Sequence, residues 1–554
     1  MKSSALRRIE RLYRRKVPPR QVISPDLSRD LARLSFEAGR QLGLLIGRDG
    51  SVEMILVGGP RSLFIPDLPK SRGGRRRLRG LRLVHTHLQS EALSQDDLMD
   101  LVFLRLDCVA AVRVDPHGGA TNLEVAHVLP ALDGDHGWEI LPLLPCHDPD
   151  LDFQELVKSL EDELEKNRSA VPSEKQQDRA ILVGVTGADR EAATRSMEEL
   201  VELARAGGIT AVDTIIQRQR EPNPKYLIGK GKLSEIVLRA LQCGVDLLIF
   251  DQELNPSQVK SITDTTELRV IDRTQLILDI FAQRAQSREG KIQVEMAQLK
   301  YLLPRLGVKD DALSRLTGGI GTRGPGETTL EINRRRTKDR IAQLDQELRM
   351  VRKSRGQRRS RRIRRDMPVV SIVGYTNAGK STLLNTLTRS AVFVENKLFA
   401  TLDPTSRRLR FPRDFEVIVT DTVGFIRDLP EDLLDAFAAT LEEMDDADLL
   451  LHVVDIGNPQ FEEQMEAVEA ILERLGLHLK PTILVFNKVD RMDPEFVRHQ
   501  VSRFGGVAIS ALSPQTLEPL IEEMQNVVEA MMETRADPAL ENLSGVEEEP
   551  GMVG

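Results

Sequence analysis

The chain has 554 residues, 40% of them hydrophobic, and a formal net charge of −8. Such a length predicts roughly three or four domains with ordinary cores. The basic N-terminal segment lacks the apolar core of a signal peptide, and no apolar run reaches the roughly 18–20 residues that span a bilayer. The three cysteines form no CxxC pair, which argues against a disulfide framework or a zinc knuckle. We therefore expect a cytoplasmic protein with no transmembrane segment; peripheral association with a membrane stays open.

Residues 1–150 are expected to form an N-terminal α/β extension. Apolar runs predict strands at 42–47, 52–59, 81–88 and 108–114. A helix is predicted at 94–106, with Ser94 as its N-cap. The charged segment 151–179 has helical spacing and then polar residues, so we expect a helical linker there.

Two histidines and an aspartate stand out in this extension. His85 and His87 end a predicted strand, and Asp97 follows in the next helix. The pattern H-x-H followed by S-x-x-D resembles the signature of JAMM-type metallopeptidases, which implies that these three residues bind Zn²⁺ with water.

The extension also departs from that signature. Leu88 stands in place of the usual proline, and the spacing to Ser94 is short. Arg40 stands where the catalytic glutamate would fall, and Glu37 and Glu53 are out of register. The expected outcome is a fold relative that has lost catalysis; a functional metal site and a coincidental match remain the alternatives.

Strand and helix patterns alternate in residues 180–300. Strands are predicted at 180–186, 210–217 and 245–254, helices at 191–208 and 232–244, and a long helical stretch at about 272–303. This βαβ rhythm predicts a small parallel sheet. Weak ATP binding by this domain stays open, although it contains no phosphate-binding loop.

Residues 301–366 combine a glycine-rich loop, "GGIGTRGPGE" at 318–327, with basic helices. Residues 334–365 hold fifteen Arg or Lys and only three acidic residues. Such a surplus favours contact with nucleic acid phosphates, with salt-sensitive affinity. The alternative is a solvated helix face with i,i+4 ion pairs.

A strand, a glycine loop and a helix open the last domain, expected at 367–535 and followed by a disordered acidic tail at 536–554. The loop "GYTNAGKS" at 374–381 fits G-x-x-x-x-G-K-[ST], in which backbone N–H groups and a helix N-terminus bind phosphates. We expect Lys380 to reach the β- and γ-phosphates and Ser381 to bind Mg²⁺.

A second motif, "DTVG" at 421–424, ends another predicted strand. We expect Asp421 to hold Mg²⁺ through water and the Gly424 N–H to sense the γ-phosphate. Between the two motifs lies "FATLDPT" at 399–405. Its Thr401 is the candidate to complete the Mg²⁺ coordination when GTP is bound; the alternative is a turn ended by proline.

The motif "NKVD" at 487–490 predicts guanine recognition. Asp490 can accept hydrogen bonds from guanine N1 and N2, which adenine cannot offer, so the nucleotide should be GTP or GDP. We expect Asn487 to brace the phosphate loop and the Lys488 stem to cover the base. The motif "SAL" at 510–512 can offer backbone N–H groups to guanine O6.

The residues expected to bind the nucleotide fall into five groups along the last domain. They are Gly374, Tyr375, Thr376, Asn377, Ala378, Gly379, Lys380, Ser381 and Thr382; Phe399, Ala400, Thr401, Leu402 and Asp403; Asp421, Thr422, Val423 and Gly424; Asn487, Lys488, Val489 and Asp490; and Ser510, Ala511 and Leu512.

Phe425 stands where many nucleotide switches have a catalytic glutamine. An apolar ring cannot polarise water, so we expect intrinsic turnover on the order of 10⁻⁴ to 10⁻² s⁻¹ and activation by a partner. Asn377 occupies a loop position that resembles potassium-activated GTPases, so K⁺ is a second possible activator. The alternative is that Asn377 only shapes the loop.

The order of these motifs, with "FATLDPT", "DTVGFIRDLP" and "GGIGTRGPGE", resembles the HflX family of translational GTPases. "GKGKLSEI" at 229–236 and "FDQELNPSQ" at 250–258 are similar to the N-terminal domain of the same family. The resemblance covers about 180–533. It implies a multidomain α/β protein: a P-loop GTPase domain with a mostly parallel sheet, a small α/β domain with a basic helical segment, and the extension.

The resemblance also implies that the partner is the large (50S) ribosomal subunit and that GTP hydrolysis accompanies the splitting or rescue of stalled ribosomes. Candidate contacts with ribosomal RNA are Arg323, Arg334, Arg335 and Arg336. We expect a monomer. Two alternatives remain: a GTPase of RNA modification or subunit assembly, and an N-terminal peptidase-like or binding module regulated by GTP.

Overall fold

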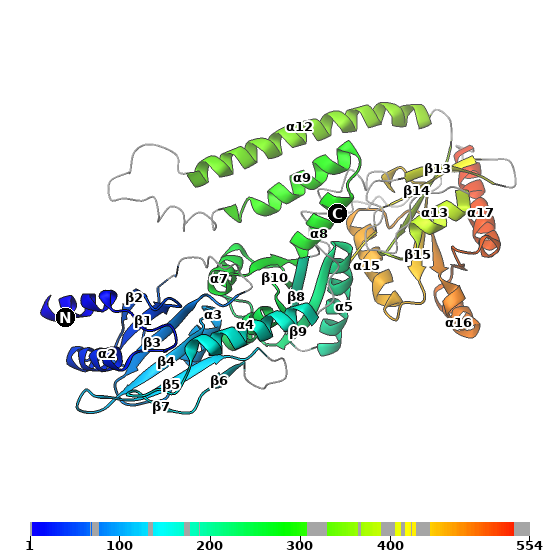
Figure 1. Ribbon diagram of the computed structural model, residues 1–554. Helices are drawn as coiled ribbons and strands as arrows, with labels where there is room; N and C mark the ends of the chain where they lie inside the picture. Colours follow the sequence, from blue (N-terminus) through cyan, green and yellow to red (C-terminus); the bar gives the residue numbers. More distant parts are fainter. Residues whose placement is uncertain are drawn as a thin grey trace, which may run out of the picture. The chain divides into compact units, whose positions relative to one another are not determined.

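The computed structural model describes residues 3–66, 68, 77–130, 137–170, 178–187, 189–306, 329–363, 367–388, 405–411, 416–422, 424–427 and 444–536 (Figure 1). The chain divides into two compact units. The first holds Met1–Ala204 and Gly208–Arg273, and the second holds Arg205–Gly207 and Thr274–Gly554.

The N-terminal extension is built on a mixed sheet in the order β2-β1-β3-β4-β5-β6, with β7 also paired to β5. β3 and β4 are parallel, and the other neighbours are antiparallel. The strands are β1 (Leu42–Gly47), β2 (Val52–Val57), β3 (Leu81–His87), β4 (Cys108–Val114), β5 (Ala120–Val128), β6 (Trp138–Ile140) and β7 (Leu144–Pro145). The helices are α1 (Ser3–Glu10), α2 (Pro25–Ala38), α3 (Gln95–Phe103) and α4 (Phe153–Ala170), with a 3-10 turn at Arg11–Arg14.

Both faces of this sheet are covered, which explains why β3 is buried along its whole length. Successive side chains of a strand point to opposite faces. Val84 accordingly packs in one hydrophobic cluster with Leu31 of α2, and Leu83 in another with Val102 of α3. α3 begins where the sequence predicted, because Ser94 and Asp97 form a capping box.

The second sheet of this unit is parallel, in the order β11-β10-β8-β9. Its strands are β8 (Asp178–Thr186), β9 (Ile209–Arg218), β10 (Leu247–Phe250) and β11 (Arg269–Asp272), and its helices are α5 (Arg190–Ala206), α6 (Lys230–Cys243) and α7 (Pro256–Thr266). The parallel sheet confirms the βαβ prediction. α7 was not predicted, although Asn255 caps it and Gln258 completes a capping box.

α6 joins the two sheets of the first unit into one hydrophobic cluster. That cluster contains Val102 of α3, Leu164 of α4 and Leu238 of α6. The Gln242 side chain donates to the Leu129 carbonyl oxygen at 2.8 Å. A Cβ atom at Gly137 would lie 1.6 Å from Leu238 Cδ2, so the backbone of the extension lies directly against α6.

Among the described residues, the second unit begins with the helices α8 (Arg273–Arg284), α9 (Arg288–Leu302) and α12 (Thr329–Ile363). The helical stretch predicted at about 272–303 is present as two helices, because Ser287 starts a new helix by accepting the Gly290 N–H at 2.9 Å. α9 and α12 lie side by side in Figure 1 and share a small apolar cluster of Ile292, Met296, Leu344 and Leu348.

The last domain has a sheet in the order β13-β14-β12-β15-β16-β17, parallel except for the pair β13–β14. Its strands are β12 (Val369–Gly374), β13 (Thr405–Arg410), β14 (Glu416–Asp421), β15 (Leu449–Asp455), β16 (Thr482–Asn487) and β17 (Val507–Ala508). Its helices are α13 (Lys380–Thr388), α15 (Phe461–Arg474), α16 (Pro494–Phe504) and α17 (Glu518–Ala536), with 3-10 turns at Val489–Arg491 and Pro514–Leu517. The predicted α/β fold class is confirmed.

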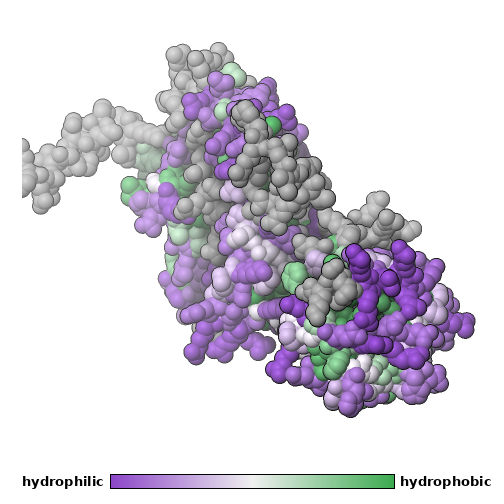
Figure 2. All heavy atoms as spheres, turned by 90° about the vertical axis from the view of Figure 1, so that its left-hand side faces the viewer, coloured by the Kyte–Doolittle hydropathy of each residue, from purple (hydrophilic) through white to green (hydrophobic). Residues whose placement is uncertain are grey.

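The described helices include none that is both long and apolar enough to cross a bilayer. On the face drawn in Figure 2, hydrophilic side chains cover most of the coloured surface, and hydrophobic ones gather only in small groups. That view therefore shows no broad apolar face.

Candidate nucleotide site

The phosphate loop joins β12 to α13 and needs glycine at two places. Gly374 has φ +149°, and a Cβ atom there would lie 2.2 Å from the Val453 carbonyl oxygen. Gly379 has φ +97°, and its Cβ would lie 2.2 Å from Nδ2 of Asn487. Both positions combine a backbone conformation that favours glycine with a lack of space for any side chain.

Phe425 fastens the segment after β14 to the phosphate loop. Its side chain is buried. Its backbone N–H donates to the Gly374 carbonyl oxygen at 3.1 Å, and its carbonyl accepts the Thr376 N–H at 2.7 Å. The Tyr375 hydroxyl accepts the Arg427 N–H at 2.7 Å. Phe425 therefore occupies the glutamine position as a packing residue.

Lys380 lies inside the loop, and its ammonium donates to the carbonyl oxygens of Gly374 at 3.0 Å and Tyr375 at 2.7 Å. Burial lowers the pKa of Lys380 to about 8, which the negative charge of Asp421 partly opposes. The Ser381 hydroxyl donates to Oδ2 of Asp421 at 2.6 Å. The loop thus presents one buried ammonium beside a pair of oxygen ligands.

The base-recognition motifs meet on the other side of the phosphate loop. Asn487 donates from Nδ2 to the Ala378 carbonyl oxygen at 2.8 Å and accepts the Ala511 N–H at 2.9 Å. The Ser510 hydroxyl donates to Oδ1 of Asp490 at 2.6 Å. Asn487 therefore connects the three loops through its two amide atoms. Val489 is half-buried and Leu512 is exposed.

Lys488 has a partner, Asp455, that was not predicted. Lys488 has φ +65°, and its ammonium donates to the Asn377 carbonyl oxygen at 2.8 Å and to Oδ2 of Asp455 at 2.6 Å. Asp455 ends β15, which lies between β12, the strand before the phosphate loop, and β16, the strand that ends at Asn487. A carboxylate at the end of the apolar run "LLLHVV" was the available signal.

Several predicted site residues lie outside the described residues. They are Val423, the group Phe399, Ala400, Thr401, Leu402 and Asp403, and Arg323. Thr382 lies in the first turn of α13, and Thr422 donates from its hydroxyl to the Ile372 carbonyl oxygen at 2.7 Å. Asp421 ends β14, and Gly424 lies just after it. Each remaining predicted nucleotide residue lies in the phosphate loop, at the start of α13, or in the motifs at 487–490 and 510–512.

Arg334, Arg335 and Arg336 are exposed in the first half of α12. Acidic residues further along already contact basic side chains: Asp345 lies 2.8 Å from Arg349. Arg340 contacts Glu295 of α9 at 2.8 Å, which fixes α12 against its neighbour. The exposed arginines precede this fixed segment.

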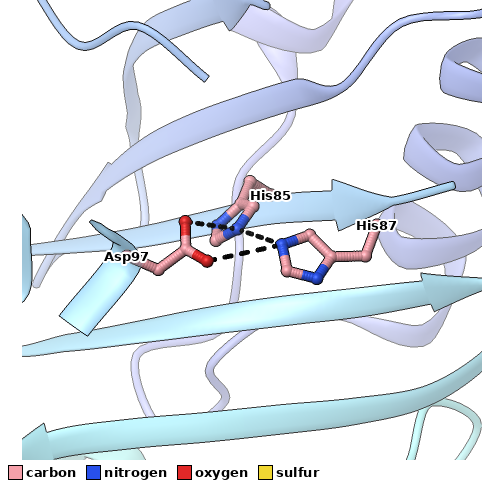
Figure 3. Close-up of side chains that lie close together, drawn as sticks. All are labelled: His85, His87 and Asp97. Atoms are coloured by element: carbon pink, nitrogen blue, oxygen red, sulfur yellow. Dashed lines mark hydrogen bonds and ion pairs between the residues drawn. The ribbon is translucent and has the colours of Figure 1, made fainter. Parts of the chain in front are cut away.

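His85, His87 and Asp97 lie together in the first unit, and Figure 3 shows the three side chains converging. Glu37 and Arg40 take no part in this cluster. Glu37 pairs with Arg8 and Arg33, and Arg40 donates to the Gly58 carbonyl oxygen.

Three family models match the chain in order. Residues 194–282 match the GTP-binding GTPase N-terminal model, residues 284–362 the GTP-binding GTPase middle region, and residues 369–488 the 50S ribosome-binding GTPase model. The phosphate loop, Asp421 and Asn487 all fall within the third match.

Curated relatives agree with these matches. A protein of Caldanaerobacter subterraneus subsp. tengcongensis named GTPase HflX is 48% identical over 348 residues, covering 63% of this chain and 80% of that protein. GTPase HflX of Escherichia coli K12 is 45% identical over 344 residues, covering 60% and 81%. A solved GTP-binding protein from Sulfolobus solfataricus in complex with GDP is 25% identical, with a TM-score of 0.37, and covers 64% of this chain and 100% of that one. On the extent of the curated matches and the presence of the P-loop domain, this chain belongs to the HflX family and is a GTPase.

Proposed function

We propose that this GTPase binds the large ribosomal subunit or the 70S ribosome and hydrolyses GTP to split or rescue stalled ribosomes under stress. The match of residues 369–488 to the 50S ribosome-binding GTPase model carries the proposal. The exposed arginines of α12, in the middle region of the family, support it because clustered guanidinium groups bind RNA phosphates.

The nucleotide roles follow from the contacts in the three loops. Lys380, already buried beside the loop carbonyls, neutralises the phosphates, and the loop N–H groups bind their oxygens. Asp490 selects guanine, with Ser510 fixing one of its oxygens. Asn487 holds the phosphate loop and the 510–512 loop at a fixed distance from each other through its two hydrogen bonds, so that the phosphates and the base of one nucleotide can be bound at the same time.

The donor set fits Mg²⁺. The Ser381 hydroxyl is a hard oxygen ligand at the start of α13, and the Asp421 carboxylate, 2.6 Å from it, would hold the ion through water. A nucleotide phosphate would add further oxygens. When bound, Mg²⁺ would supply charge stabilisation to the phosphates. Thr401 is proposed as the ligand that arrives with GTP.

Phe425 explains why a partner is needed. Its ring is packed and its backbone is held by the phosphate loop, so it cannot orient water. We infer that the ribosome orders the segment carrying Thr401 and supplies the missing group. K⁺ is a second proposed activator through Asn377, whose φ of +62° also suits a residue that only shapes the loop.

The deciding experiment measures GTP turnover by the full chain in K⁺ buffer, with and without purified 50S subunits. We expect stimulation of about 10³-fold or more, in the range that partner activation gives other GTPases. Stalled 70S ribosomes should separate into subunits on sucrose gradients with GTP. Asp490→Asn is the matched control, because it should lose the response to GTP while leaving the phosphate loop intact.

Other outcomes favour the alternatives. Preference for assembly intermediates over mature 50S subunits would favour a role in subunit assembly. Normal GTP binding without stimulation by any ribosomal particle would refute the proposed partner. Equal turnover in K⁺ and Na⁺ would refute the role of potassium while leaving the ribosomal proposal standing.

A further inference from the structure

The three side chains of Figure 3 come from two elements that the fold fixes rigidly. His85 and His87 are two residues apart on β3, so they project from the same face of a fully buried strand. Asp97 is the third residue of α3 and is held by the capping box with Ser94. The cluster therefore forms where a strand end meets a helix N-terminus.

The spacing of the ligand atoms matches a metal site. Nε2 of His85 lies 2.9 Å from Nε2 of His87. Asp97 places Oδ1 3.2 Å from the first ring and Oδ2 3.6 Å from the second. Ligands about 2.0–2.1 Å from a tetrahedral ion lie about 3.3 Å apart. The two distances from Nε2 of His85 are close to that value, and the distance from His87 to Asp97 is measured to the other carboxylate oxygen. With one ligand atom from each residue, all three atoms lie within 4.8 Å of one another.

Two of the three ligands are oriented by a second layer of contacts. Nδ1 of His87 lies 2.9 Å from the Glu91 carbonyl oxygen, an acceptor, so this nitrogen carries the proton and Nε2 presents a lone pair to the cluster. The Ser94 hydroxyl and N–H both donate to Oδ2 of Asp97, at 2.6 and 2.8 Å. Ser94 thereby sets the direction of the carboxylate.

From these contacts we propose that His85, His87 and Asp97 bind one zinc-class divalent ion, with water as its fourth ligand. Two imidazoles and one carboxylate suit Zn²⁺ better than Mg²⁺ or Ca²⁺, which prefer oxygen ligands alone. The ion fastens α3 to β3. α3 in turn packs in the cluster that contains α6, so the site stabilises the join between the two sheets.

The affinity should be moderate. Among the described residues, Nδ1 of His85 has no hydrogen-bond partner, so this ring lacks the second contact that orients His87. Loss of such a contact typically weakens metal binding about 10–100-fold. The rival explanation needs no metal: the single Nε2–H of His85 is shared between Oδ1 of Asp97 and Nε2 of His87.

Metal binding to the full, nucleotide-free chain distinguishes the two. The protein is stripped with a chelator, titrated with Zn²⁺, and then with Co²⁺ as an optical probe. We expect about one equivalent of Zn²⁺ and an absorption spectrum of four- or five-coordinate Co²⁺. The melting temperature should rise when Zn²⁺ is restored, since a ligand of the native state stabilises it.

Asp97→Asn is the test variant, because its amide oxygen can still cap α3 while binding metal poorly. Since loss of an outer contact alone costs about 10–100-fold, loss of a ligand should lower Zn²⁺ affinity by about 100-fold or more and abolish the Co²⁺ spectrum. His127→Asn is the matched control. His127 is a third buried histidine of the same sheet; it lies in β5, and Nδ1 of its ring contacts the Val128 carbonyl oxygen.

The variants also separate metal binding from folding. Retained GDP binding and a cooperative thermal unfolding transition would show that Asp97→Asn folds. If Asp97→Asn does not fold, His87→Gln is used in the same titration. Equal Zn²⁺ binding by the wild type, the test variant and the control would overturn the proposal. A wild-type chain that binds neither ion at micromolar concentration would also overturn it. If Asp97→Asn then still melts at a lower temperature, the hydrogen-bonded network without metal accounts for the cluster.

Discussion

At the scale of single residues, Phe425 has a buried, packed side chain at the position where many nucleotide switches have a catalytic glutamine. Gly424 just before it also lacks room: a Cβ atom there would lie 2.7 Å from Cγ2 of Thr376 and 3.0 Å from Nζ of Lys380. The segment after β14 therefore presses its backbone against the phosphate loop. A water-orienting side chain at 425 would point into the core, away from the phosphates.

Replacing Phe425 with Gln should consequently give no faster hydrolysis. The variant buries an amide in an apolar site and should lose roughly 3 kcal/mol of unfolding free energy, measured by denaturant titration. Basal GTP turnover should stay at or below the wild-type rate. Phe425→Leu, which keeps most of the apolar volume, is the control and should cost about 1 kcal/mol. A Gln variant with faster basal turnover would contradict the packing role.

Lys380 should make nucleotide binding depend on pH. Burial lowers its pKa to about 8 in the nucleotide-free protein, and a bound phosphate raises that pKa because it favours the ammonium form. Above pH 8 the free loop has lost the proton that the complex needs, so binding must take it up. The Henderson–Hasselbalch relation gives about 0.9 protons at pH 9 and about 0.1 at pH 7.

Calorimetry in two buffers of different ionisation enthalpy measures this uptake directly. The difference in apparent binding enthalpy for GDP should be large at pH 9 and small at pH 7. Equal proton uptake at both pH values would show that the pKa of Lys380 is not lowered in the free loop.

At the scale of elements, the sequence predicted the features that depend on a few neighbouring residues. The phosphate loop between β12 and α13 and the Ser94 cap of α3 were predictable, because a few adjacent residues determine each of them. The approach of His85 to His87 followed from their spacing on one strand. The break before Ser287 was missed, since helical periodicity on both sides concealed it.

Contacts between distant segments were beyond the reach of the sequence. Lys488 and Asp455 are 33 residues apart, and Gln242 and Leu129 are 113 apart. Arg79 and Arg105, both nearly buried, contact Glu267 at the end of α7. Nothing in the local pattern of either partner specifies such a pair, because the pairing depends on how whole elements pack.

The exposed arginines at the start of α12 are expected to contact ribosomal RNA. The variant Arg334→Glu/Arg335→Glu/Arg336→Glu should weaken binding to 50S subunits and leave GDP affinity unchanged, since α12 lies outside the nucleotide loops. Loss of three phosphate contacts should reduce the slope of log affinity against log salt by about 2–3. Arg498→Glu, on exposed α16, is the control and should change neither quantity. An unchanged slope in the triple variant would place the RNA contacts elsewhere.

At the scale of the whole molecule, the extension differs from an added domain on a linker. The family models begin at residue 194, yet the extension shares a continuous core with the sheet that follows it. α6 packs on its own sheet, and its Leu238 and Gln242 side chains also contact the extension. The start of the family match at residue 194 therefore does not mark the edge of a separately packed domain, because one hydrophobic core contains residues from both sides of it.

Deletion of residues 1–170 should accordingly destabilise what remains. The deletion uncovers Leu238 and its neighbours on α6, and exposed apolar patches of this kind cause association. We expect a lower melting temperature for the remaining chain, binding of the dye ANS, and loss of solubility, while GDP affinity is retained. Leu238→Ser in the shortened chain is the matched control and should reduce ANS binding. If the shortened chain melts like the full one and binds no dye, the shared core contributes nothing to stability and the extension is an independent domain after all.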